Sequence, residues 1–203
     1  MGAAADEHQA SSRPADPDAA WTGMWWSAPC TSGLPHSTRT LPGPHRVGPA
    51  VVQPVRTPVG LHLVEDEMGW PTATTWPVRP GPDARVLEIR DAAGWASLVA
   101  RHPLVVSAAR RHDWYRCTGR VGDWLVPDWG AVAEQVDGVH VPVATWLSLA
   151  GRPVEVPGTG AATVLAGWHP DATWWLTDVL QVGEPTGWVR TDDDPPGRWA
   201  PSS

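Results

Sequence analysis

The sequence predicts an α+β domain with one or more small, largely antiparallel twisted sheets, three short helices and a Pro/Trp-rich irregular N-terminal arm. Three stretches beyond residue 84 repeat the i, i+3, i+4, i+7 spacing of an amphipathic helix. Five or six short strand patterns lie among them. The gaps between these strands are too short and uneven for regular βαβ crossovers, which favours antiparallel pairing.

The first 82 residues differ in composition from the rest of the chain. Residues 1–20 are Ala, Pro, Ser and Asp without periodicity, which predicts a disordered leader. Proline is so frequent over 21–82 that helices are disfavoured there, and a weak alternation predicts one strand at 60–65. Exposed indoles are costly to leave in water. The four Trp residues 25, 26, 70 and 76 therefore predict that this arm packs on a core at 84–190.

Strands and helices alternate from residue 84 onward. A strand is predicted at 84–89, and Asp91 is expected to cap the first helix. Pro103 ends that helix, and a short strand follows at 104–107. One face of the first helix should be buried: Trp95, Leu98, Val99 and His102.

The same arrangement then recurs twice. A strand at 124–126 leads to a helix capped by Asp128, and a strand at 139–141 leads to a helix that begins at Pro142. Further strands are expected at 162–167 and 172–180, and a disordered tail at 191–203, so that 21–190 form a single globular domain. The inward faces of the second and third helices should include Val132 and Leu147, respectively.

Composition excludes several classes of protein. The chain has 203 residues and a net charge of −7, which argues against general nucleic-acid binding because that requires a broad basic face. Cys30 and Cys117 form neither a disulfide framework nor a zinc pattern. The sequence has no basic region followed by an apolar run, and no stretch near the ~20 apolar residues of a membrane span. These absences predict a cytoplasmic protein without membrane contact.

Four arginines within eleven residues are the densest positive charge of this acidic chain. Guanidinium groups present a planar fork to anions, and neighbouring Trp rings could form the walls of a pocket. The alternative is a solvated face, or Arg stems packed on Trp. The predicted ligand-binding residues are Arg110, Arg111, Arg116, Arg120, Trp114 and Trp124.

Other chemical groups give weaker signals. Cys117 lies near arginines, but its spacing to Arg120 does not match the phosphatase loop. The eight His residues include no HExxH motif, so no metal site is predicted, and His140 is expected to be a hydrogen-bonded structural residue. Asp137 begins a strand after a turn. Asp171 joins a loop to a strand beside Trp residues, where it could stabilise positive charge or serve as an ordinary turn residue.

The segments DWGAVAEQVDGVHV and ATVLAGWHPDATWWL resemble parts of uncharacterised actinobacterial proteins. The order of elements is similar to that of ADP-ribosyltransferase-like domains, which bind NAD in a cleft between small sheets. Such domains use an early Arg or His, a middle Ser, Thr or Tyr, and a late acidic residue, usually Glu. The resemblance implies His36 or Arg39 as the early residue with His62 as a rival, Thr118 or Tyr115 as the middle residue, and Asp171 as the late one.

Two functions follow as expectations. The first is an ADP-ribosyltransferase-like domain that binds NAD or another nucleotide through Arg side chains and Trp walls. The alternative is a non-catalytic Trp-rich module that binds a protein or a small anionic ligand.

Overall fold

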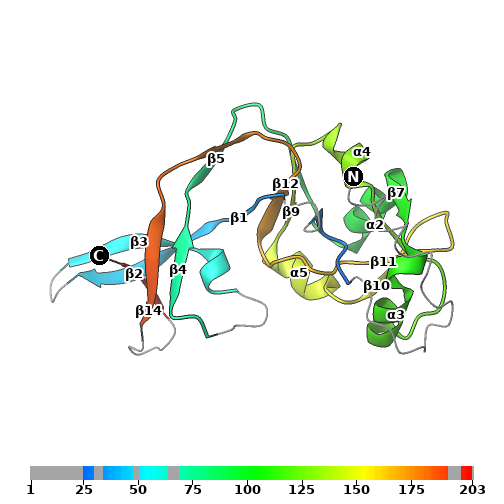
Figure 1. The fold of residues 1–203 in the computed structure, drawn as a ribbon, viewed down its shortest axis with the longest axis horizontal. Coiled ribbons are helices and arrows are strands. Elements are labelled where there is room, and N and C mark those ends of the chain that lie inside the picture. The colour runs from blue at the N-terminus through cyan, green and yellow to red at the C-terminus, as the bar shows by residue number, and fades with distance from the viewer. Residues whose placement is uncertain (1–24, 30–33, 48–50, 64–68, 192–197, 203) are drawn as a thin grey trace.

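The computed structural model describes residues 25–29, 34–47, 51–63, 69–191 and 198–202. The described residues form four α-helices and six small sheets, so the predicted α+β class is confirmed. Every strand pair is antiparallel except β6–β9. Figure 1 shows the four α-helices gathered in one half of the molecule and, beside it, a β-rich half of strands with one short 3-10 helix. The leader expected at 1–20 lies outside the described residues.

A four-stranded sheet, here called the central sheet, lies in the helical half. Its strand order is β1 (His36–Thr38), β12 (Ala172–Trp175), β9 (Gly138–Val141) and β6 (Val86–Glu88). β1 runs antiparallel to β12, β12 antiparallel to β9, and β6 parallel to β9. The arm therefore supplies an edge strand of this sheet.

Two of the three expected helices form as the sequence predicted. Asp91 caps α2 (Ala92–Arg101) by accepting a hydrogen bond from the Gly94 amide, and Asp128 caps α4 (Trp129–Ala133) through two backbone amides. Leu98 and Val132 are both 1% exposed, which confirms the inward faces of these helices.

The third helix, α5 (Val143–Leu149), forms where expected, but its predicted face is wrong at Leu147, which is 65% exposed. The helix buries Thr145 and Leu149 instead. Thr145 Oγ1 donates a hydrogen bond of 2.9 Å to the Arg90 carbonyl. The spacing of apolar residues does not predict the burial of a hydroxyl that bonds to a backbone group. The buried face of α5 is therefore the one that contains Thr145, not the one that contains Leu147.

A further helix, α3 (Ser107–Thr118), was not expected from the sequence, because its charged residues occur on every side. It buries Ala109, Arg110, His112 and Trp114, so half of its inward face is polar. Gly119 ends the helix in the left-handed conformation that glycine favours, with φ 70°.

Tryptophan rings dominate the interior in two clusters. Trp168 contacts Trp95, Trp129 and Trp174 with ring centroids 5.9–6.3 Å apart, under the central sheet. The second cluster centres on an edge-to-face contact of 5.2 Å between Trp114 and Trp124. It lies beside two small sheets, β7 (Pro103–Val105) with β8 (Leu125–Pro127), and β10 (Pro153–Glu155) with β11 (Ala162–Val164).

The Pro-rich arm forms strands rather than the irregular structure expected. β2 (Thr40–Val47) pairs with β3 (Val51–Pro58), β4 (Thr72–Thr75) with β14 (Thr186–Thr191), and β5 (Val78–Pro80) with β13 (Leu180–Val182). Proline is tolerated in β2, β3 and β5 because all three are edge strands, where an N–H can be absent from the ladder.

Two segments differ from the sequence expectation in this half. Residues 59–61 form the 3-10 helix η2 (Val59–Leu61) where a strand was expected at 60–65. Residues 198–201 form β15 (Arg198–Pro201), paired with β14, within the segment expected to be a disordered tail.

Candidate functional site

The clearest polar cluster lies at the end of the central sheet where β1 ends and β12 begins. Arg39 directly follows β1 and Asp171 directly precedes β12. Arg39 Nε donates hydrogen bonds of 2.9 and 3.0 Å to Asp171 Oδ1 and Oδ2, and Arg39 Nη2 also donates to Oδ1. The resemblance implied Arg39, or alternatively His36, as the early residue and Asp171 as the late one, and the structure brings Arg39 and Asp171 together.

The two partners differ sharply in burial. The Asp171 side chain is 4% exposed, whereas the Arg39 side chain is 63% exposed. Hydrogen bonding to Asp171 is the main cause that raises the pKa of Arg39 above its ordinary value. The buried carboxylate therefore holds a guanidinium that remains open to solvent.

Asp171 is held by its turn as well as by Arg39. Among the described residues it is the one non-glycine residue with positive φ, at 59°. The turn closes with a hydrogen bond from the Ala172 amide to the His169 carbonyl. Asp tolerates this left-handed conformation better than most residues, at some conformational cost. The strain is located at the residue that orients Arg39.

His140 is the third member of the cluster, and its side chain is 8% exposed. His140 Nδ1 lies 2.9 Å from Thr173 Oγ1, while Nε2 has no hydrogen bond and lies 3.7 Å from Asp171 Oδ1. Burial, and then the charge of Arg39, lower the pKa of His140 against the opposing effects of Asp171 and Glu88. A hydrogen bond with the Ala172 backbone also opposes this lowering of the His140 pKa. The lowered pKa favours the neutral imidazole, whose buried Nε2 lies next to the Asp171 carboxylate.

Strand register places His140 in a polar row. Ser37, Thr173, His140 and Glu88 are successive neighbours across all four strands of the central sheet, on the face opposite the Trp cluster. From the sequence, His140 was expected to be a hydrogen-bonded structural residue, and Thr173 and Glu88 were not expected to be near it. The missing signal was register, because residues on four separate strands become neighbours only when the pairing is known.

His36 lies beside the cluster on the other face of β1. Its ring stacks on His169 with centroids 4.9 Å apart, and contacts Trp174 at 4.8 Å. Burial against these rings, and then repulsion by His169, lower the pKa of His36. His36 is thus near the site in the chain, but its described contacts are aromatic.

Comparison with protein-family models, curated proteins and solved structures gives no match. Among the described residues, no three or more His, Cys, Asp or Glu side chains are grouped to hold a metal ion. No helix in the described part of the chain is both long and apolar enough to cross a membrane.

The Arg cluster of α3 and the following loop is placed differently from the predicted pocket. Arg110 is 3% exposed, and its Nε donates a hydrogen bond of 3.0 Å to the Trp26 carbonyl. Arg120 pairs with Glu155 at 3.0 Å and lies 5.1 Å from the centre of the Trp124 ring. Both guanidinium groups thus fasten segments of this chain to one another. Figure 1 places α3 well away from β1 and β12.

The predicted aromatic walls are interior residues. Trp114 and Trp124 are both 0% exposed, so neither ring can stack on a ligand at the surface. Arg111 is half-buried on α3, and Arg116 is exposed there.

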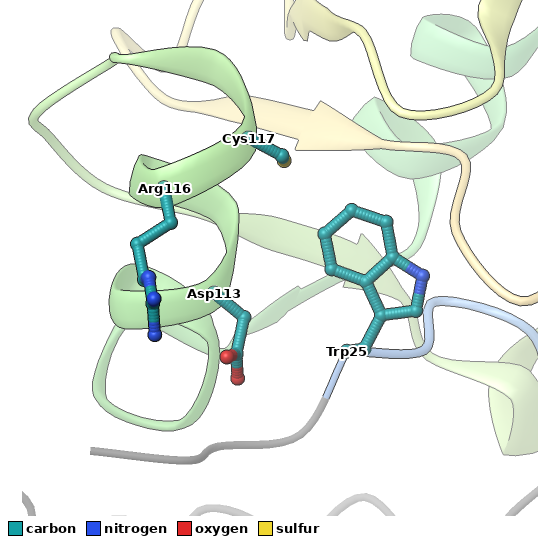
Figure 2. A pocket seen from close by; sticks show the side chains of 4 residues that line it. All are labelled: Trp25, Asp113, Arg116 and Cys117. Carbon is teal, nitrogen blue, oxygen red and sulfur yellow. The ribbon is translucent and has the colours of Figure 1, made fainter. Parts of the chain in front are cut away.

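A surface hollow beside α3 is lined by Trp25, Asp113, Arg116 and Cys117, as Figure 2 shows. The Arg116 guanidinium lies on the far side of Asp113 from the indole ring in this view. Burial raises the pKa of the Cys117 thiol, with Asp113 contributing, so Cys117 is poorly suited to nucleophilic attack.

The remaining predicted residues have local structural contacts. Thr118 Oγ1 donates to the Trp114 carbonyl one turn back, and the Tyr115 carbonyl accepts from the Gly119 amide at the helix end. The amide of His62 donates to the Val59 carbonyl at the end of η2. Asp137 accepts hydrogen bonds from the Arg85 amide and from Thr177 Oγ1, both of 2.8 Å, and so ties strand ends together.

Proposed function

We propose that this chain binds a small anionic ligand of the nucleotide or phosphate class, with Arg39 as the principal contact. The observation that carries the proposal is the asymmetry of the Arg39–Asp171 pair, in which a 4% exposed carboxylate holds a 63% exposed guanidinium. Asp171 takes Nε and Nη2, so the edge that carries Nη1 is left for a second acceptor. A prearranged guanidinium loses less freedom when it binds an oxyanion.

The neighbouring groups suit a ligand with both a charged and a hydrogen-bonding part. His140 Nε2 is a buried ring nitrogen without a hydrogen bond, next to the same carboxylate. His36 begins β1 on the opposite face, where its exposed ring stacks on His169, so it is not one of these groups. Phosphate esters of sugars or nucleosides combine these features.

Geometry favours binding over ADP-ribosyl transfer. In that reaction the late carboxylate must contact the ribose and stabilise the positive charge that develops as nicotinamide leaves. Asp171 is 3% exposed, and both of its oxygens accept hydrogen bonds from Arg39. The carboxylate is therefore already occupied in the role of positioning Arg39.

ADP-ribosyl transfer with NAD is the second candidate. It is supported by the direct contact between the early Arg39 and the late Asp171, which the resemblance to transferase-like domains implied as members of one site. This function requires Arg39 to release the carboxylate when NAD binds.

The experiment is thermal unfolding of the full chain with phosphate, ADP-ribose and NAD, followed by a nicotinamide-release assay with NAD. A ligand present at 100 times its Kd stabilises the folded chain by about 2.7 kcal/mol. We expect stabilisation by at least one of these anions and no release of nicotinamide. Absence of stabilisation by all three overturns the binding proposal, and nicotinamide release that Asp171→Asn abolishes establishes the second candidate.

Two arginine variants locate the site. Arg39→Gln should remove the stabilisation, because it removes the guanidinium that contacts the anion. Arg116→Gln is the matched control, since Arg116 is an exposed member of the cluster on α3. If Arg116→Gln removes binding and Arg39→Gln keeps it, the site lies on α3 and the assignment to Arg39 is wrong.

A further inference from the structure

The β-rich half carries two exposed Trp residues that the proposed anion site does not use. Trp70 is 64% exposed and Trp76 is 54% exposed, and they stand on either side of β4. Thr72 and Thr74 are also exposed, whereas Ala73 and Thr75 are half-buried. Because successive side chains of a strand point to opposite faces, Thr72 and Thr74 share the outer face of β4. The exposed Trp70 and Trp76 stand just beyond the two ends of the strand, at positions that continue this alternation.

The neighbouring strands extend this outer face. Register places Thr72 beside Val189 and Val189 beside Ala200, and places Thr74 beside Gly187. A Cβ on Gly187 would meet Ser202 Oγ at 2.2 Å, so the Ser202 hydroxyl lies over this glycine on the same face. The Trp–Thr face is defined here as Trp70, Thr72, Thr74, Trp76, Gly187, Val189, Ala200 and Ser202.

The opposite face of this sheet is the one that packs inward. Trp188 lies between Gly187 and Val189 and is 5% exposed. Its Nε1 donates a hydrogen bond of 2.7 Å to Thr75 Oγ1. Trp188 is thus buried with its N–H hydrogen-bonded, whereas Trp70 and Trp76 remain in solvent. Large exposed aromatic groups are costly without a partner, and they mark binding surfaces.

The chemistry of the Trp–Thr face selects the kind of partner. Along β4 and its register partners this face carries aromatic rings, hydroxyl groups and small residues. The next register pair on the same face, Thr191 with Arg198, places one arginine position at its edge. Nucleic acid requires a basic groove along its backbone, and the chain carries a net charge of −7. Protein interfaces favour larger apolar groups at their centre, where this face carries threonine hydroxyls.

We propose that the Trp–Thr face binds an uncharged carbohydrate chain. One face of a pyranose ring is lined by C–H groups and can stack on an indole, while its rim of hydroxyl groups can bond to Thr and Ser. Trp70 and Trp76 are six residues apart, which corresponds to ~20 Å along an extended strand. That span suits several linked sugar rings rather than a single one.

The test is native electrophoresis of the full chain in gels that contain a soluble polysaccharide, with sedimentation on insoluble cellulose and chitin. The soluble probes are hydroxyethylcellulose, xylan, starch and mannan. We expect at least one to retard the protein, and Trp70→Ala and Trp76→Ala each to weaken the apparent affinity about tenfold, as truncation of a central aromatic anchor does.

Trp26→Ala is the control, because Trp26 is 45% exposed and packs against Gly167 in the other half of the molecule. Circular dichroism and thermal unfolding establish that each variant is folded. Carbohydrate binding on this face is wrong if no polysaccharide binds the wild type, or if both β4 variants bind as tightly as the wild type. Binding of single-stranded DNA by the Trp–Thr face, in place of any polysaccharide, also overturns it.

Discussion

The pair formed by Arg39 and Asp171 should contribute measurably to stability, although one partner is exposed. Asp171→Asn removes the charge but keeps the shape, and Asn tolerates the positive φ of 59° at this position. A hydrogen bond to a charged group contributes about 1.5–3 kcal/mol. Since the Arg39 side chain is 63% exposed, solvent screening reduces this value, and we expect a loss of about 1–2 kcal/mol.

A double-mutant cycle isolates the interaction energy between Arg39 and Asp171 from the individual effect of each substitution. The free energies of unfolding in urea are measured for the wild type, Arg39→Gln, Asp171→Asn and the double variant. The pair predicts a coupling energy of about 1 kcal/mol or more, because each single change already removes the shared interaction. Single effects that add to within about 0.5 kcal/mol would refute the pairing of these two side chains.

Four other changes test the helices and the central sheet by urea unfolding. Leu98→Ala should cost about 2–5 kcal/mol while Leu147→Ala changes stability by less than about 0.5 kcal/mol, and equal losses would contradict the orientation of α5. Gly138→Ala should cost about 1–3 kcal/mol because its Cβ would lie 3.0 Å from Trp175 Cε3; an unchanged midpoint would contradict this contact. Because folding lowers the pKa of His140, the unfolded chain binds more protons below about pH 6.5, so stability falls as the pH drops through that value. The variant His140→Gln should flatten this slope between about pH 7.5 and 5.5, and an unchanged slope would show that His140 is protonated equally in both states.

Local sequence signals predicted the helices α2 and α4 well, because a capping side chain and an apolar period both indicate a helix there. Asp91 and Asp128 cap helices because a short carboxylate before an apolar period satisfies the first free amides. α3 escaped prediction because a buried arginine and a buried histidine break the apolar period on which helix prediction depends. The arm escaped it because proline penalises central strands but not edge strands, and sequence alone does not reveal which strands are edges.

The candidate site was predictable only in part. Arg39 and Asp171 are separated by 132 residues, and their expected proximity came from a resemblance rather than from spacing. His140 joins them through strand register, which depends on long-range pairing. The dense arginines of α3 and the following loop were misleading, because charge density along the sequence does not show which way each side chain points. Arg110 bonds to the Trp26 carbonyl, and Arg120 bonds to Glu155.

Calorimetric titration of Arg39→Lys against the wild type tests the oriented guanidinium most directly. Lysine keeps the positive charge but lacks the planar fork that Asp171 holds. With the anion that most stabilises the wild type, the account predicts at least about tenfold weaker binding to Arg39→Lys, which corresponds to about 1.4 kcal/mol. Equal affinity of the two proteins would show that charge alone suffices, and would contradict a site built on the orientation of Arg39 by Asp171.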